Sequence, residues 1–179
     1  KSDSDSRTDK EAILKVFNKV FNEMQGFCGS LPWLADLEGH MVKEGSYEAF
    51  KSRFQELAGS SWEETREDFY FEEDNIVQAL ADTTRMSIEA ARNWYHKAEE
   101  NYSLSIGKFA NKVKEYIESK GKEHHVIFLV DEMGQYIGDD RGLILNLQTV
   151  VEDLGTYCGG KAWVIVTSQQ DIDTVTRVR

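Results

Sequence analysis

Two neighbouring carboxylates, Asp131 and Glu132, come directly after an unbroken apolar run, Val126–Val130. A short apolar run bounded by polar residues is typical of a strand that is buried on both faces of a parallel sheet. Ligands of such sheets bind beyond the carboxyl ends of the strands, which is where these two acids lie. One carboxylate could hold the hydration shell of a magnesium ion, and the other could polarise an attacking water.

A second apolar run, Ala162–Val166, ends in the small polar residues Thr167 and Ser168. The residues between the two runs predict a glycine-rich loop and then an amphipathic helix that ends near Gly155. A strand, a helix and a strand over this length form a βαβ unit, whose strands are parallel with a right-handed crossover. The residues from Thr167 to Gln169 should therefore lie beside the two acids.

A polar side chain in that position could hydrogen-bond the attacking water or the terminal phosphate of a nucleotide. It would thereby sense whether the phosphate is present. Asp139 or Asp140 is the expected N-cap of the intervening helix.

The remaining signals are nearly all helical. Residues 13–24 carry a helical apolar stripe that closes at Gly26, and residues 31–102 carry several more. Helix starts are expected at capping serines, and helix ends at glycines. The expected starts are Ser46, Ser61, Ser87 and either Ser103 or Ser105, and the expected ends are Gly59 and Gly121. We interpret the aromatic residues on these stripes as helix core and not as a ligand groove.

Composition limits the function classes. The chain has 179 residues, of which 40% are hydrophobic and 30% charged, and its formal net charge is -11. Electrostatic binding of nucleic acid needs clustered Lys and Arg residues. The sequence has no such cluster, so direct nucleic-acid contact is not expected. The acidic stretch 56–74 is interpreted as a solvated helical face, with a docking patch for a basic partner as the alternative. No apolar run has membrane-spanning length, and the two cysteines favour a cytoplasmic setting.

An apolar strand that ends in Asp-Glu, followed by a strand that ends in a small polar residue, resembles the Walker B and sensor elements of AAA-like P-loop ATPases. The longer run 125–175 resembles the large P-loop ATPases of bacterial BREX bacteriophage-exclusion systems (the BrxC and PglY type). The segments that carry this resemblance are 131–138, 145–155 and 163–172.

The resemblance implies that the intact parent is a large cytoplasmic ATPase that uses ATP and Mg²⁺ and works with other BREX components against phage DNA. It also implies a role for each site residue. Asp131 would coordinate magnesium, Glu132 would activate water, and Thr167 or Ser168 would be the sensor.

The chain departs from the family pattern at the phosphate loop, G-x-x-x-x-G-K-[ST]. Its three Gly-Lys pairs are not followed by Ser or Thr. The segment Gly155–Ala162 has the glycine and lysine spacing, but it ends in Ala, which cannot bind magnesium. It also leaves a helix and enters a strand, so we interpret it as a turn. The phosphate loop is expected upstream of Lys1, and this chain alone should hold no cofactor and hydrolyse no ATP.

Other residues offer weaker signals. His124 and His125 lack further ligands at zinc-site spacing and are expected to face solvent. The two cysteines, Cys28 and Cys158, have no CxxC partner, so neither is expected to act as a nucleophile. One of the two arginines after the second strand, Arg177 and Arg179, could act as an arginine finger across a subunit interface, although an ordinary surface role is the simpler interpretation.

The expected architecture is α/β: an incomplete parallel-sheet P-loop core with a mainly α-helical insertion. Residues 1–30 would contribute the first helix of the core, 31–102 the insertion, and 103–179 the Walker B and sensor part. Unpaired sheet edges would favour self-association. The alternative is a helical protein-interaction module on a non-catalytic α/β scaffold.

Overall fold

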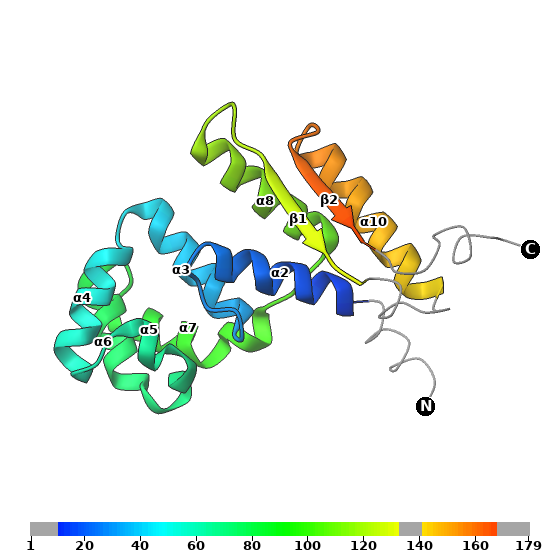
Figure 1. Ribbon diagram of the computed structural model, residues 1–179. Helices are drawn as coiled ribbons and strands as arrows, with labels where there is room; N and C mark the ends of the chain where they lie inside the picture. Colours follow the sequence, from blue (N-terminus) through cyan, green and yellow to red (C-terminus); the bar gives the residue numbers. More distant parts are fainter. Residues whose placement is uncertain (1–10, 133–140, 168–179) are drawn as a thin grey trace, which may run out of the picture. The chain divides into compact units, whose positions relative to one another are not determined.

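The chain has a mixed α/β fold that is mainly helical and contains one two-stranded parallel sheet (Figure 1). This computed structural model describes residues 11–132 and 141–167. The chain divides into two compact units, one of Lys1–Phe17 with Leu104–Arg179 and the other of Asn18–Ser103. The first boundary falls inside helix α2 (Ala12–Met24), whereas the sequence suggested a boundary after residue 30. None of the helices in the described part of the chain is long and apolar enough to cross a membrane.

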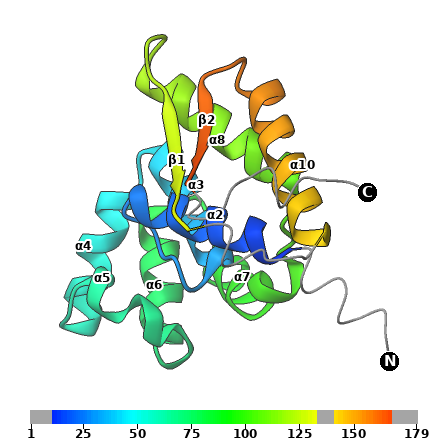
Figure 2. The ribbon, with the colours of Figure 1, turned by 45° about the vertical axis from the view of Figure 1, so that its right-hand side comes forward.

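The sheet unit is built around strands β1 (Val126–Val130) and β2 (Ala162–Val166). They pair in parallel, with Val126 opposite Ala162 and Val130 opposite Val166. Helix α10 (Arg141–Tyr157) lies between them in sequence and packs against β2 and against α8 (Ile106–Lys120), as Figures 1 and 2 show. The expected strand, helix and parallel strand are therefore present.

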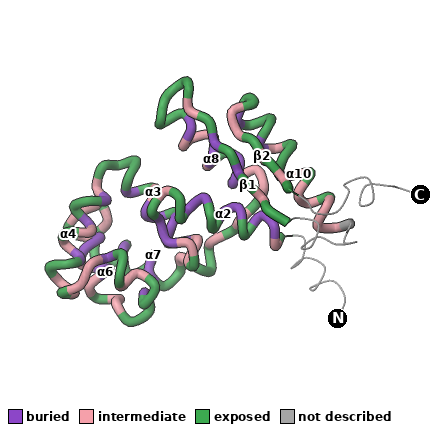
Figure 3. Tube along the Cα trace, viewed as in Figure 1, coloured by how far each residue is buried: buried purple, intermediate pink, exposed green. Residues whose placement is uncertain are grey.

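One face of this sheet is buried and the other is open. Val126 and Phe128 are buried, and the Phe128 ring packs against Phe17 of α2 and Phe109 of α8. The alternate residues of β1 and their partners in β2 are apolar but exposed, as the green stretches of these strands in Figure 3 show. They are Ile127 (56% exposed), Leu129 (76%), Trp163 (58%) and Ile165 (48%).

The prediction that β1 is buried on both faces is therefore wrong for this chain. Apolar side chains on both faces make a strand suitable for double burial, but burial also requires a segment that covers each face. The helices packed on the sheet contact the face that carries Phe128, and within the described part of this unit no segment covers the other.

Helix ends of the sheet unit follow their capping residues. The Ser105 hydroxyl accepts a hydrogen bond of 3.2 Å from the Lys108 N–H at the start of α8. Helix α10, by contrast, runs past Gly155 to Tyr157. The helix stops there because Gly159 and Gly160 adopt positive φ angles of 57° and 77°, which end the helix more effectively than a glycine in helical conformation. The expected N-caps Asp139 and Asp140 lie outside the described residues.

The helical unit packs most of its aromatic residues into one core, whereas Tyr70 and Phe71 are exposed. Its elements after α2 are α3 (Pro32–Glu44), α4 (Tyr47–Ala58), α5 (Trp62–Thr65), the 3-10 helix η1 (Arg66–Phe71), α6 (Glu73–Thr83) and α7 (Ile88–Asn101). The buried aromatic side chains of this core are Phe27, Trp33, Tyr47, Phe50, Phe54, Trp62, Phe69 and Tyr95. Most aromatic stripes in this region are therefore helix core, as predicted. Ser87 caps α7 by accepting from the Ala90 N–H, and Gly59 ends α4 at a φ of 78°.

Candidate functional site

The ends of β1 and β2 bring Asp131 and Thr167 together. Because Val130 pairs with Val166, the two residues that follow lie at the same edge of the sheet. The Thr167 N–H donates to the Val130 carbonyl at 2.9 Å, and its hydroxyl donates to Oδ1 of Asp131. The expected neighbourhood of the first acid and the polar end of the second strand is thus present for Thr167, whereas Ser168 lies outside the described residues.

Glu132 has a left-handed backbone conformation at this edge. It is the one non-glycine residue with positive φ in the described part of the chain, at 53°. Its N–H donates hydrogen bonds to Oδ1 of Asp131 at 3.0 Å and to Oγ1 of Thr167 at 3.2 Å. A left-handed conformation costs an ordinary L-residue about 1–2 kcal/mol. The two hydrogen bonds offset part of that cost, and non-glycine residues held in such conformations cluster at functional sites.

The geometry gives each group a possible chemical task. Both hydrogen bonds to Asp131 reach the same oxygen, Oδ1, so its second carboxylate oxygen can serve a ligand. The three side chains at this edge are exposed, which suits a hydrated Mg²⁺ that keeps several waters and takes one or two protein carboxylates. Among residues 11–132 and 141–167, no group of three or more His, Cys, Asp or Glu side chains could hold a metal by itself.

The Gly155–Ala162 segment is a turn at the opposite end of β2. The Gly160 N–H donates to the Gly155 carbonyl at 3.2 Å, and the Lys161 ammonium donates to the Lys122 carbonyl at 2.7 Å. The segment lies before β2, whereas Asp131 and Thr167 lie beyond the far ends of the strands, about 16 Å away for five residues. Its lysine therefore does not reach the acidic pair.

The histidine and cysteine candidates from the sequence each contact neighbouring groups. The ring of His124 packs edge-on to Tyr116, and Nδ1 of His125 lies 2.9 Å from the Glu123 carbonyl. Burial raises the pKa of the Cys158 thiol, which disfavours the thiolate that a nucleophile needs. Cys28 is fully buried, and its backbone N–H donates to Glu38. Arg177 and Arg179 lie outside the described residues.

A buried carboxylate that sequence patterns did not indicate organises the helical unit. Glu38 of α3 is fully buried and accepts four hydrogen bonds. Its donors are the Cys28 N–H at 2.6 Å, the Tyr47 hydroxyl at 2.9 Å, the Trp62 Nε1–H at 2.8 Å and the Arg66 guanidinium at 3.1 Å. Burial, reinforced by the charge of Glu38, raises the pKa of the Tyr47 hydroxyl. These donors come from four segments, so Glu38 ties the unit together.

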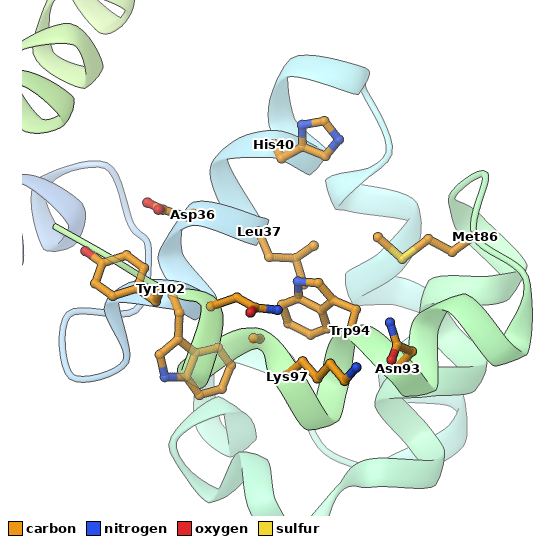
Figure 4. Close-up of a pocket in the computed structure, with 11 residues that line it drawn as sticks. Asp36, Leu37, His40, Met86, Asn93, Trp94, Lys97 and Tyr102 are labelled. Carbon is orange, nitrogen blue, oxygen red and sulfur yellow. The ribbon is translucent and has the colours of Figure 1, made fainter.

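The helical unit also contains a concave site between α3 and α7, which we call the α3–α7 groove. Its volume is about 470 Å³. Trp33 and Leu37 of α3 line it from one side, and Trp94 of α7 lines it from the other. The ring centroids of Trp33 and Trp94 are 6.1 Å apart. Figure 4 shows Leu37 directed toward the Trp94 ring, with Met86 beyond it. Trp94 packs against the core but is only partly buried, so its indole also lines the groove.

Polar residues border this groove on both helices. Asp36 and His40 lie on α3, and Asn93, Lys97 and Asn101 lie on α7. Tyr102 closes one end near Asp36 (Figure 4). Burial, followed by the charge of Asp36, raises the pKa of its hydroxyl to about 12.

No model of a known protein family matches this chain. No solved structure matches it either.

Proposed function

We propose that the sheet unit is part of the ATP-hydrolysing core of a P-loop ATPase, of the type that works in bacterial BREX defence. The observation that supports it best is the hydrogen bond between Thr167 and Asp131, since it unites the ends of two parallel strands in the manner that a Walker B acid and a sensor residue require. In this proposal Asp131 holds Mg²⁺, Glu132 activates the attacking water, and Thr167 or Ser168 reports the terminal phosphate.

The rest of the proposed site comes from the intact parent. The phosphate loop would be supplied by a segment other than these residues, because no Gly-Lys pair of this chain is followed by Ser or Thr. ATP and Mg²⁺ would therefore bind the parent ATPase, in the cytoplasm and together with other BREX components. The open sheet face of β1 and β2 fits this proposal, because parallel sheets in such folds are covered on both faces.

Replacement of the proposed base tests this function. In the parent ATPase, Glu132→Gln keeps the size of the side chain and removes its capacity to accept a proton. ATP should still bind, but hydrolysis should fall by about 100-fold or more, so that ATP remains bound after gel filtration. The matched control is Glu123→Gln, at the other end of β1, which should leave hydrolysis unchanged. Equal hydrolysis by Glu132→Gln and the control would contradict the proposal. ATP turnover by this chain alone that Glu132→Gln abolishes would contradict the expectation that the phosphate loop is supplied by another segment.

The second candidate function is a helical protein-interaction module. The observation that favours it is the α3–α7 groove, whose volume of about 470 Å³ lies within the range of binding sites and whose lining combines indoles with polar residues. The two functions are compatible in one protein, because hydrolysis in one unit can move a partner bound to another. Partner binding that needs neither nucleotide nor Asp131 and Glu132 would support the second function.

A further inference from the structure

The α3–α7 groove has an elongated lining. On α3 it is formed by residues one turn apart, including Trp33, Leu37 and His40. On α7 the lining continues from Asn93 to Asn101, eight residues that rise about 12 Å along the helix. About four residues of extended chain cover the same length. The groove thus matches a short stretch of extended peptide.

The border on α7 offers groups that recognise a peptide backbone. Asn93, Lys97 and Asn101 follow one another at a spacing of four residues, so they form a row along one side of the helix. An asparagine side chain carries both a donor and an acceptor, which is what the N–H and C=O of a peptide unit require. Within the described part of the chain, the side chains of Asn93 and Asn101 make no hydrogen bond. A helical ligand has no use for such a row, because its backbone groups are already paired.

Lys97 adds a charge preference. Acidic residues outnumber basic ones by about two to one between residues 18 and 103, and most basic side chains of this unit are ion-paired, as Lys51, Arg53 and Arg92 are. Lys97 has no carboxylate partner among the described residues although it lies in this acidic surrounding. Lys97 lies halfway along the asparagine row, and its stem is long enough for the ammonium group to reach a ligand side chain that points away from the groove floor.

We propose that the α3–α7 groove binds an extended segment of a partner protein, with apolar side chains against Trp33, Leu37 and Trp94 and a carboxylate paired with Lys97. Asn93 and Asn101 bind the backbone of the segment. This inference deepens the second candidate function and is independent of the ATPase proposal.

Peptide pools test it on the whole chain in the absence of nucleotide. Two capped, fluorescein-labelled pools carry randomised apolar residues on both sides of one fixed position, which is glutamate in one pool and lysine in the other. By fluorescence anisotropy the glutamate pool should bind at least about tenfold more tightly, as one charge-assisted pair predicts. Lys97→Gln should remove this preference and Lys97→Glu should reverse it. Lys19→Gln, which replaces a lysine on α2 outside the groove, should leave it unchanged.

A third pool separates the possible occupants. Its peptides keep the glutamate but carry N-methyl groups on the backbone, and they should lose affinity if Asn93 and Asn101 bind peptide units. Equal affinity of the methylated and unmethylated pools would overturn the proposal, as would equal affinity of the glutamate and lysine pools. Self-association of the chain that Lys97→Gln weakens would also overturn it in favour of a second copy as occupant. A whole partner protein that binds Lys97→Gln as well as the unchanged chain would support the interaction module and reject the groove.

Discussion

The hydroxyl of Thr167 and the carboxylate of Asp131 are joined by a hydrogen bond, although the two residues are 36 positions apart in sequence. The same hydroxyl accepts from the Glu132 N–H, so residues from two strands form one hydrogen-bonded group. Parallel pairing in register makes this possible, because both strands end at the same level.

Thr167→Val should remove one of the two acceptors of the Glu132 N–H and leave only Oδ1 of Asp131. Valine keeps the branched shape of threonine but has no hydroxyl, so the hydrogen bonds to Asp131 and Glu132 are lost. The Glu132 amide should then exchange its proton with solvent several-fold faster, which NMR hydrogen exchange measures residue by residue. Thr149→Val is the control, because the Thr149 hydroxyl donates within α10, to the Leu145 carbonyl. If both variants leave the Glu132 amide unchanged, the hydrogen bond contributes nothing to the order of this edge.

Glu132→Gly should stabilise the chain. The φ of 53° at this position strains a side chain but not a glycine, and the relief is about 1 kcal/mol. Urea unfolding measures the change. Glu123→Gly removes the same charge where φ is not positive, and it should be neutral or destabilising by up to about 1 kcal/mol. A loss of stability in Glu132→Gly as large as that of the control would show that the left-handed turn is not strained.

Glu38→Gln should destabilise the chain strongly. A glutamine amide keeps one acceptor oxygen and puts an NH2 donor in place of the other, so it opposes either the Cys28 N–H at Oε2 or the donors of Tyr47, Trp62 and Arg66 at Oε1. It also leaves the Arg66 guanidinium without its carboxylate. Removal of one partner of a buried ion pair costs about 3–5 kcal/mol, which urea unfolding followed by tryptophan fluorescence can measure.

A milder matched pair keeps this test informative if Glu38→Gln does not fold. Tyr47→Phe removes one buried hydrogen bond to Glu38 and should cost about 1 kcal/mol or more. Tyr70→Phe removes a hydrogen bond to Glu99 that is exposed, and it should cost less than about 0.5 kcal/mol. Equal costs would mean that the Glu38 network does not hold the unit together.

Stability should fall at alkaline pH through Tyr102. Its hydroxyl has an ordinary pKa of 10.0 when the chain is unfolded and a pKa of about 12 when it is folded, chiefly because it is buried. The folded state therefore favours the neutral hydroxyl. The stabilisation of the folded state by the neutral Tyr102 hydroxyl is fully present below pH 10 and is lost as the pH rises through 12. Tyr102→Phe should lose less stability over that range than the unchanged chain in urea unfolding at stepped pH. A parallel decline of both proteins would refute this assignment.

Much of the local structure could be predicted from the sequence because it depends on local chemistry. Ser87 and Ser105 cap helices through their own side chains, and Gly59 ends a helix through its own backbone freedom. The two apolar runs pair in parallel because the intervening helix allows that connection. The neighbourhood of Asp131 and Thr167 follows directly from that pairing.

Features that depend on distant partners could not be predicted. Ile127 and Phe128 are both apolar, yet one is open and the other is buried, since the helices pack on the Phe128 face. The donors of Glu38 have no common spacing in sequence, so no periodic pattern reveals them. The α3–α7 groove was missed for a similar reason, because Trp94 looks like core until the surface around it is known.

The fluorescence of Trp163 can report binding to the open sheet face of β1 and β2. Of the four tryptophans, Trp33 and Trp62 are buried and Trp94 is partly buried, whereas Trp163 on β2 is 58% exposed. Quenchers dissolved in water should therefore reach Trp163 before the others. Any segment or partner that binds this face of β1 and β2 should shield that indole and shift its emission toward the blue, so the binding can be followed without attaching a dye.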